Sequence, residues 1–341
     1  MGVPSQEAIN QFKALMDQVD EPLKRTFKNV HQGYIVETLE RFLKAREGNV
    51  NKAHKMLVDS LQWRLQNGID DILSKPIIPT NFYRGVRDSQ LIGVSGYTRE
   101  GLPVFAIGAG LSTFDKASIH YYVQSHIQIN EYRDRVILPN ATKKNGRYIG
   151  KCVKVLDMSG LKLSALNQIK LLTTISTVDD LNYPEKTITY YIVNVPYVFS
   201  ACWKVVKPLL QERTKLKVQV LQGNGREELL KIMDYSSLPH FCKRSGSGSS
   251  SWSGSGSGSG SGSDTSDCYS LDHPFHQELY TYMKQQSGIN EPLEPAKQGS
   301  VHVEVPLGEE AEIHKTLESE LKKLRNQKSL SGSFQNFKIG N

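Results

Sequence analysis

The stretch from Asn182 to Gly223 constrains the fold most, because two strand patterns flank one helical pattern. Residues 188–195 are almost uniformly apolar and rich in β-branched and aromatic side chains, which predicts a strand covered on both faces. Residues 216–221 alternate polar and apolar side chains and predict a second strand. Between them, apolar residues recur at helical spacing and predict a helix from about 198 to 210: Val198, Phe199, Cys202, Trp203, Val206 and Leu210.

This central helix is apolar around most of its circumference. Only Ser200, Lys204 and Lys207 form a polar stripe, and Pro208 is expected to kink or end the helix. Such a helix is either deeply buried or faces an apolar environment. The sequence holds no run of about 18 apolar residues, so we expect any membrane contact to be peripheral. If the helix lies at a membrane surface, Lys204 and Lys207 could meet anionic headgroups, at roughly 1 kcal/mol each.

The remainder of the chain divides into segments of different composition. Residues 1–75 are predicted to form an all-helical module, and residues 76–244 an α/β domain. In that domain, strands and helices alternate, which predicts a mostly parallel sheet with helices on its faces. Residues 245–263 are a Gly/Ser-rich flexible linker. Residues 264–341 are expected to be a largely disordered tail with short helices, one of them over 269–283. Within the α/β domain the predicted elements are strands at 102–108 and 151–157 and helices at 115–139, 164–181 and 226–233.

Composition and motifs argue against catalysis. The net charge of +7 is compatible with an anionic partner such as a membrane, a phosphate or a nucleic acid, and also with an ordinary basic protein. The four cysteines are scattered without a CxxC pair, which favours a reducing compartment and excludes a structural zinc site of that type. The sequence lacks GxGxxG, GxxxxGK[ST] and GxSxG motifs. We therefore expect no enzyme activity, no cofactor and no metal.

Two passages resemble a known family. TLERFLKAREGNVNKAHKMLVDSLQWR (Thr38 to Arg64) is similar to the helical module that precedes CRAL-TRIO lipid-binding domains. VLDMSGL and the stretch from Asn182 to Leu221 resemble that domain's strand, gate helix and strand, and the likeness covers about residues 5–241. The resemblance is greatest to the fungal and plant phosphatidylinositol transfer proteins. It implies an α/β fold in which a helical module precedes a sheet floor, helical walls and a gate helix.

The resemblance also implies a site for an inositol phosphate headgroup. Glu185 of YPE and Thr214 and Lys217 of RTKLK match that site, and Arg46 of KARE matches a further basic position. Lys217 can pair with a phosphate, Thr214 can donate to it, and Glu185 can accept from inositol hydroxyls. Glu47 stands where the family pattern has a basic residue. The alternative is that Glu185 caps a turn and Lys217 is a solubilising charge on an edge strand.

A second cargo site departs from the family pattern. The subgroup that also carries phosphatidylcholine has two hydroxyl residues where Cys152 and Lys154 stand here. A buried ammonium needs a partner. Lys154 is therefore expected to reach either an anionic lipid or a protein carboxylate. In the first case phosphatidylcholine exchange is expected to be weakened or lost.

These implications give one functional expectation and two alternatives. The chain is expected to bind phosphatidylinositol in a gated apolar pocket and to transfer it between membranes or present it to lipid kinases. It would act as a cytoplasmic monomer, peripheral to Golgi or plasma membranes, with roles in phosphoinositide signalling and protein transport and no nucleic-acid partner. The alternatives are a lipid-sensing scaffold that recruits partners through its tail, and a carrier of a tocopherol- or retinoid-type ligand.

Overall fold

The N-terminal module is a bundle of four helices. The computed structural model describes residues 4–77, 80–243 and 267–288. The module comprises α1 (Gln6–Met16), α2 (Glu21–His31), α3 (Ile35–Ala45) and α4 (Val50–Asn67). The Asn49 side chain caps α4 by accepting from the Lys52 amide at 2.9 Å, and Gly68 ends it with φ +58°. The apolar faces of all four helices meet in one core, which includes Phe12, Leu23, Phe42 and Leu57.

The sheet has five strands whose spatial order follows the chain. After the turn η1 (Ile69–Ser74) and α5 (Thr80–Ser89), β1 (Ile92–Tyr97) pairs antiparallel with β2 (Pro103–Ile107). The remaining strands, β3 (Cys152–Asp157), β4 (Thr187–Val193) and β5 (Val218–Val220), are added in parallel, each beside its predecessor. Parallel strands are joined by right-handed crossovers, so successive crossovers in one direction bring their helices to the same face.

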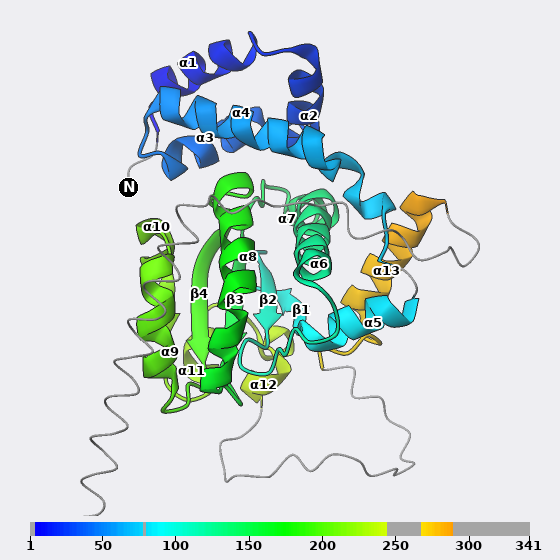
Figure 1. The fold of residues 1–341 in the computed structure, drawn as a ribbon. Coiled ribbons are helices and arrows are strands. Elements are labelled where there is room, and N and C mark those ends of the chain that lie inside the picture. Colours follow the sequence, from blue (N-terminus) through cyan, green and yellow to red (C-terminus); the bar gives the residue numbers. More distant parts are fainter. Residues whose placement is uncertain (1–3, 78–79, 244–266, 289–341) are drawn as a thin grey trace, which may run out of the picture.

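That face carries the principal helices of the domain. Figure 1 shows α6 (Ile119–Tyr132), α7 (Leu138–Asn145) and α8 (Ile169–Asn182) in front of the strands. Phe105 of β2 and Cys152 of β3 belong to the core on this side. Val104 and Ala106 alternate to the opposite face, where the core includes side chains of α11 (Arg226–Leu229) and α12 (His240–Lys243). The mostly parallel α/β sheet with helices on its faces, expected from the sequence, is confirmed.

The helix expected to run from Asp115 to Pro139 is divided differently. It begins at Ile119, continues as α6 to Tyr132, and passes through the π-helical turn η2 (Arg133–Ile137) into α7. Pro139 lies in the first turn of α7, where its missing N–H is not needed. The π turn therefore lets the chain remain helical through the proline, which was expected to stop it.

The central helix is shorter than its apolar pattern predicts, and the predicted range is divided into several short helical segments. It consists of α9 (Phe199–Val206), followed by the 3₁₀ turn η4 (Lys207–Leu209) and α10 (Glu212–Lys215). Pro208 lies within η4 and ends the α-helix, as predicted. Figure 1 shows α9 and α10 beside β4, at the side of the sheet away from β1.

A C-terminal helix completes the largest core. The short helix expected over 269–283 is α13 (Pro274–Ser287), which lies beside α5 in Figure 1. Phe275, Leu279 and Met283 are buried in the core that includes Phe105, and the Phe105 and Phe275 ring centroids lie 6.4 Å apart. The expected linker at 245–263 and the tail beyond 288 lie outside the described residues. A truncation designed to test that tail must therefore begin after Ser287.

Substitution of Leu279 tests whether α13 is an integral part of the domain. Its side chain is fully buried, so Leu279→Ala removes apolar contacts and leaves a cavity. We expect the free energy of unfolding to fall by about 2–5 kcal/mol in urea titrations. The control is Gln286→Ala on the exposed side of the same helix, expected within about 0.5 kcal/mol of the parent. Equal stabilities of the two variants would show that α13 is only loosely attached.

Candidate functional site

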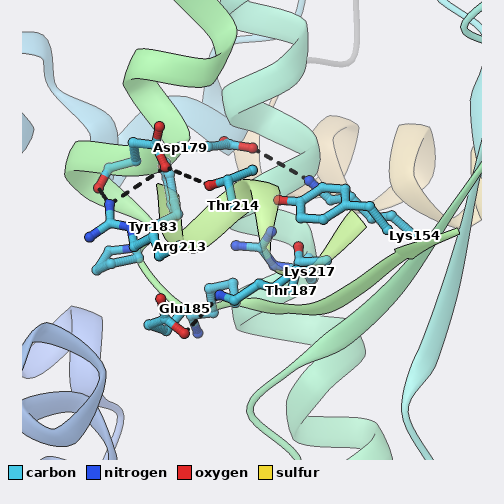
Figure 2. Close-up of a pocket in the computed structure, with 13 residues that line it drawn as sticks. Lys154, Asp179, Tyr183, Glu185, Thr187, Arg213, Thr214 and Lys217 are labelled. Atoms are coloured by element: carbon cyan, nitrogen blue, oxygen red, sulfur yellow. Dashed lines mark hydrogen bonds and ion pairs between the residues drawn. The ribbon is translucent and has the colours of Figure 1, made fainter. Parts of the chain in front are cut away.

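A polar hollow lies at the amino ends of the parallel strands. Figure 2 shows its side chains converging from α8, β3, β4 and the segment that includes α10. Ligands of open α/β sheets ordinarily bind at the opposite, carboxyl ends of the strands. The hollow therefore lies away from the usual position of an α/β active site. Its lining residues are Arg133, Lys154, Asp179, Asp180, Tyr183, Pro184, Glu185, Lys186, Thr187, Tyr190, Arg213, Thr214 and Lys217.

The structure brings together Glu185, Thr214 and Lys217, which we call the headgroup cluster. Glu185 occupies the turn between α8 and β4, and Lys217 stands directly before β5. The Lys217 ammonium lies 2.7 Å from the Glu185 carboxylate, and both side chains are mostly buried. Glu185 has φ +60°, a left-handed conformation that non-glycine residues seldom adopt. The surrounding structure must hold this turn in place. One such contact is the hydrogen bond that Arg41 donates to the Pro184 carbonyl at 3.2 Å.

Arg213 connects this cluster to the N-terminal module. Its guanidinium donates to the Ala45 carbonyl at 2.8 Å and to the Asp180 carbonyl at 2.9 Å. Thr214, the next residue, lies with its hydroxyl 3.5 Å from the Asp180 carboxylate. Sequence reasoning missed Arg213, although it opens the RTKLK stretch. Its position beside Thr214, which the resemblance assigns to the phosphate of the headgroup, was the signal that could have identified Arg213.

Arg46 is not among the residues that line the hollow. It ends α3, and its guanidinium donates to the Ala45 carbonyl at 3.0 Å, the same oxygen that accepts from Arg213. Partial burial and the neighbouring Arg213 lower the pKa of Arg46. Glu47, the residue that departs from the family pattern, follows with φ +55° and is exposed. The structure therefore places Arg46 next to the hollow rather than in its wall.

Cys152 and Lys154 do not form a separate hollow. The Lys154 ammonium lies 3.4 Å from the Asp179 carboxylate and 5.5 Å from the centre of the Tyr190 ring, within the same polar hollow. Cys152 is fully buried, and its thiol lies 3.4 Å from the Lys186 carbonyl. Of the two readings offered for Lys154, the structure shows the pairing with a protein carboxylate. That carboxylate lines the same hollow as the headgroup cluster.

Among the carboxylates that line the hollow, Asp179 has the most side-chain partners. It accepts from His126 at 2.7 Å and from Asn130 at 2.7 Å, in addition to its pair with Lys154. Burial acts to raise the pKa of Asp179, but His126 and Lys154 outweigh it and hold that pKa well below its usual range. A stable negative charge at this position fixes Lys154 as a cation in the hollow.

The segment around α9 exposes apolar side chains. The Phe199 and Trp203 rings stack with centroids 5.9 Å apart, and both are half-buried. Cys202 and Val205 pack with Leu166 in a small core of their own, whereas Lys204 and Lys207 are exposed. Tyr197 is 97% exposed and Leu216 is 80% exposed, so large apolar groups meet solvent at both ends of the segment.

Other features of the described residues bear on the class of site. Among residues 4–77, 80–243 and 267–288, no group of three or more His, Cys, Asp or Glu side chains is arranged to hold a metal ion. No helix in the same ranges is long and apolar enough to cross a bilayer. All four cysteines are free thiols, and each is buried.

Comparison with known proteins matches two parts of the chain to two family models. Residues 87–243 match the CRAL/TRIO domain, and residues 8–59 match the CRAL/TRIO N-terminal domain. The phosphatidylinositol/phosphatidylcholine transfer protein SFH9 of Arabidopsis thaliana is 28% identical over 242 residues, which are 69% of this chain and 40% of the relative. The SEC14 cytosolic factor of Eremothecium gossypii is 26% identical over 209 residues, 59% of this chain and 67% of the relative.

The fold has a counterpart among solved structures. A crystal structure of Sfh5 superposes with a TM-score of 0.51 at 16% identity, covering 67% of this chain and 84% of that protein. At this identity the likeness concerns the fold alone. The chain spans between about a third and about a half of the length of these plant relatives, from 34% to 55%.

Lys186 provides a pH-dependent test of the hollow. Burial and the neighbouring Arg41 lower the pKa of Lys186 to about 7, against 10.5 ordinarily. Between pH 7 and 10.5 the unfolded chain therefore binds more protons at this residue than the folded chain does, so its contribution to stability increases with pH. Relative to Lys186→Met, we expect the wild type to gain roughly 1–3 kcal/mol of unfolding free energy between pH 6.5 and 9.5.

The measurement is urea unfolding of both proteins at four or five pH values across this window. Lys231→Met removes an exposed lysine on a different part of the domain and serves as the matched control. Its difference from the wild type should stay constant with pH. A constant difference for Lys186→Met as well would contradict the buried, neutralised state of Lys186.

Proposed function

Because this chain belongs to the CRAL-TRIO family, we propose that it binds a phospholipid behind α9 and transfers phosphatidylinositol between membranes or presents it there. One observation carries the proposal: the headgroup cluster combines a cation, a hydroxyl and a carboxylate beside a segment with exposed apolar side chains. The curated relatives named above are described as phosphatidylinositol/phosphatidylcholine transfer proteins or as a SEC14 cytosolic factor. The proposed activity is binding and exchange rather than catalysis.

The groups of the cluster suit an inositol phosphate. An inositol phosphate offers both hydroxyl donors and phosphate acceptors, so its site needs acceptors and donors together. Lys217 supplies charge to the phosphate, Thr214 donates to it, and Glu185 accepts from an inositol hydroxyl. In the structure, Lys217 and Glu185 satisfy each other at 2.7 Å. Lipid binding would exchange this pair for contacts of the same chemical kind, so neither charge becomes buried without a partner.

Reversible exchange follows from the surroundings of the acyl chains. Burial of a CH₂ group from water is worth about 0.8 kcal/mol, but a lipid leaving a bilayer for an apolar pocket exchanges one apolar surrounding for another. The free energy of burying the acyl chains is then nearly the same in the bilayer and in the pocket, so headgroup contacts determine selectivity. The remaining barrier is passage through the interface, which the segment around α9 would lower.

The exposed side chains around α9 support a membrane-facing role for that segment. Lys204 and Lys207 are exposed on it and would meet anionic headgroups, while Tyr197 and Leu216 are accessible for insertion at its two ends. We place the protein in the cytoplasm as a monomer, peripheral to Golgi or plasma membranes, with lipid kinases as the users of its cargo. The bound phospholipid is its ligand, and it needs no further cofactor.

Single substitutions in the headgroup cluster test the proposed cargo. Lys217→Gln removes the charge that would pair with the phosphate and is expected to slow phosphatidylinositol transfer between vesicles by about 10- to 100-fold. Thr214→Val removes one neutral donor and is expected to cost about 2- to 10-fold. Lys231→Gln, an exposed control, should transfer at the wild-type rate. Normal transfer by Lys217→Gln in a protein with unchanged circular dichroism would exclude this cluster as the headgroup site.

A comparison of two lipids tests the selectivity of the part of the hollow around Lys154. Its ammonium occupies the hollow together with Tyr190, and no hydroxyl stands at either departing position. Because Lys154 is paired with Asp179, the prediction rests on the missing hydroxyl donors, which the family pattern has in the subgroup that also carries phosphatidylcholine. We expect phosphatidylcholine exchange to be at least ten-fold slower than phosphatidylinositol exchange in the same vesicle assay. Equal rates for the two lipids would contradict this prediction.

A further inference from the structure

A second hollow lies where the N-terminal module meets the lipid-binding domain. The module contributes His31, Tyr34, Thr38 and Arg41 from α2 and α3 and the turn between them, and the domain contributes a wall that includes Asp134, Tyr148 and Lys186. Figure 1 shows the module seated over the ends of the domain helices, with this junction between them. Of the headgroup cluster, none of the three residues lines this second hollow. Only Lys186 lines both hollows.

The charges at this junction are unequal. Arg41, Arg133 and Lys186 are 5%, 2% and 8% exposed. Arg133 lies 2.7 Å and Lys186 lies 3.1 Å from the two oxygens of the Asp134 carboxylate. The three carboxylates that line the first hollow already have cationic partners of their own, in the pairs Asp179–Lys154, Asp180–Arg213 and Glu185–Lys217. With Lys186 protonated, these three buried cations exceed the charge of Asp134 by two positive charges, and with Lys186 neutral the excess is one.

The same cations retain unused donors. The Nε of Arg41 and one terminal nitrogen of Arg133 are buried, and neither has a hydrogen-bond partner among the described residues. Buried donors of charged groups are costly to leave unpaired. Burial lowers the pKa of Arg41, and burial together with Arg41 lowers that of Lys186 to about 7. In contrast, Arg133 and Lys186 overcome the effect of burial and hold the pKa of Asp134 below its usual range.

We propose that the junction hollow is an anion-binding site for a phosphomonoester. A phosphomonoester carries close to two negative charges at neutral pH, which balances the excess of the buried cations once Lys186 is protonated. A guanidinium and an ammonium suit its several oxygens, and the Tyr148 and Thr38 hydroxyls add neutral donors in the wall. The Tyr34 and Tyr148 rings, 4.4 Å apart, join the module to the domain beside them. The phosphate would come from a soluble inositol phosphate or from a phosphorylated inositol lipid.

Occupation of this site has a mechanical consequence. The ligand would touch α3 of the module and η2 and Lys186 of the domain at once, so it would hold the two parts together. Lys186 faces Arg41, Arg133, Asp134 and Tyr148, with His31 elsewhere in the hollow and Glu185 in the neighbouring turn. A bound dianion would favour the charged form of Lys186. Binding would therefore be accompanied by uptake of a proton near neutral pH.

The first experiment is isothermal titration of the full chain with inorganic phosphate and with soluble inositol monophosphate, against chloride of equal ionic strength. We expect saturable binding by the wild type, weakened at least ten-fold in Arg41→Met and measurably in Tyr148→Phe. Lys231→Gln, at an exposed lysine that lines neither hollow, should bind as the wild type does. If Arg41→Met fails to fold, Tyr148→Phe and the proton uptake of the wild type, measured in two buffers of different ionisation enthalpy, decide the matter.

The results separate this site from the headgroup cluster. Absence of saturable binding by the wild type would overturn the proposal, as would loss of binding in Lys217→Gln with retention in Arg41→Met. Phosphatidylcholine vesicles with either phosphatidylinositol or its monophosphate distinguish the source of the phosphate. Arg41-dependent capture of only the phosphorylated lipid identifies a lipid headgroup, whereas Arg41-dependent binding of the soluble compound alone identifies a free inositol phosphate. Transfer of phosphatidylinositol itself tests the proposed function separately.

Discussion

The buried guanidinium of Arg64 is the contact on which the arrangement of the two parts depends. It reaches from α4 of the module to both oxygens of Glu131 in α6, at 2.7 and 2.9 Å, and to Asp70 in η1 at 2.7 Å. Tyr183 donates to the same Glu131 at 2.6 Å, one residue before the Pro184–Glu185 turn. Burial opposes the charge on Glu131, but Arg64 outweighs it and lowers the pKa of that carboxyl. Removal of one partner from such a pair costs about 3–5 kcal/mol.

This network explains why the two hollows are formed where they are. It joins the module, α6 and the end of α8, so the junction and the Glu185 turn are positioned by the same carboxylate. The polar hollow lies at the amino ends of the strands, whereas α/β enzymes use helix N-termini at the opposite ends. Here side-chain cations supply the positive charge instead. These cations are paired with carboxylates, and in the proposed function a bound headgroup would exchange those pairs for its own contacts.

Much of the fold could be predicted from local sequence patterns. The parts that could not be predicted depend on contacts between residues that are far apart in the sequence. The strand, helix and strand of residues 182–223 have unmistakable periodicity, and so do the module helices. β1 lacked such a pattern because Gly93 and Gly96 interrupt it, and Gly93 is required by the close approach of the Cys268 backbone from the far end of the chain. Glu185, Thr214 and Lys217 could be placed from the family resemblance. Arg41 and Lys186 could not, because an isolated lysine or arginine in a sequence gives no sign of burial.

The place of α13 in the core has a consequence for synthesis. Strands β1 to β5 pair in chain order, so each can add to its predecessor as it emerges from the ribosome. The core on the helix-bearing face nevertheless lacks Phe275, Leu279 and Met283 until that helix has also emerged. The residues that close the domain lie beyond the Gly/Ser tract of residues 245–263. The nascent chain therefore has its sheet early and its finished core last.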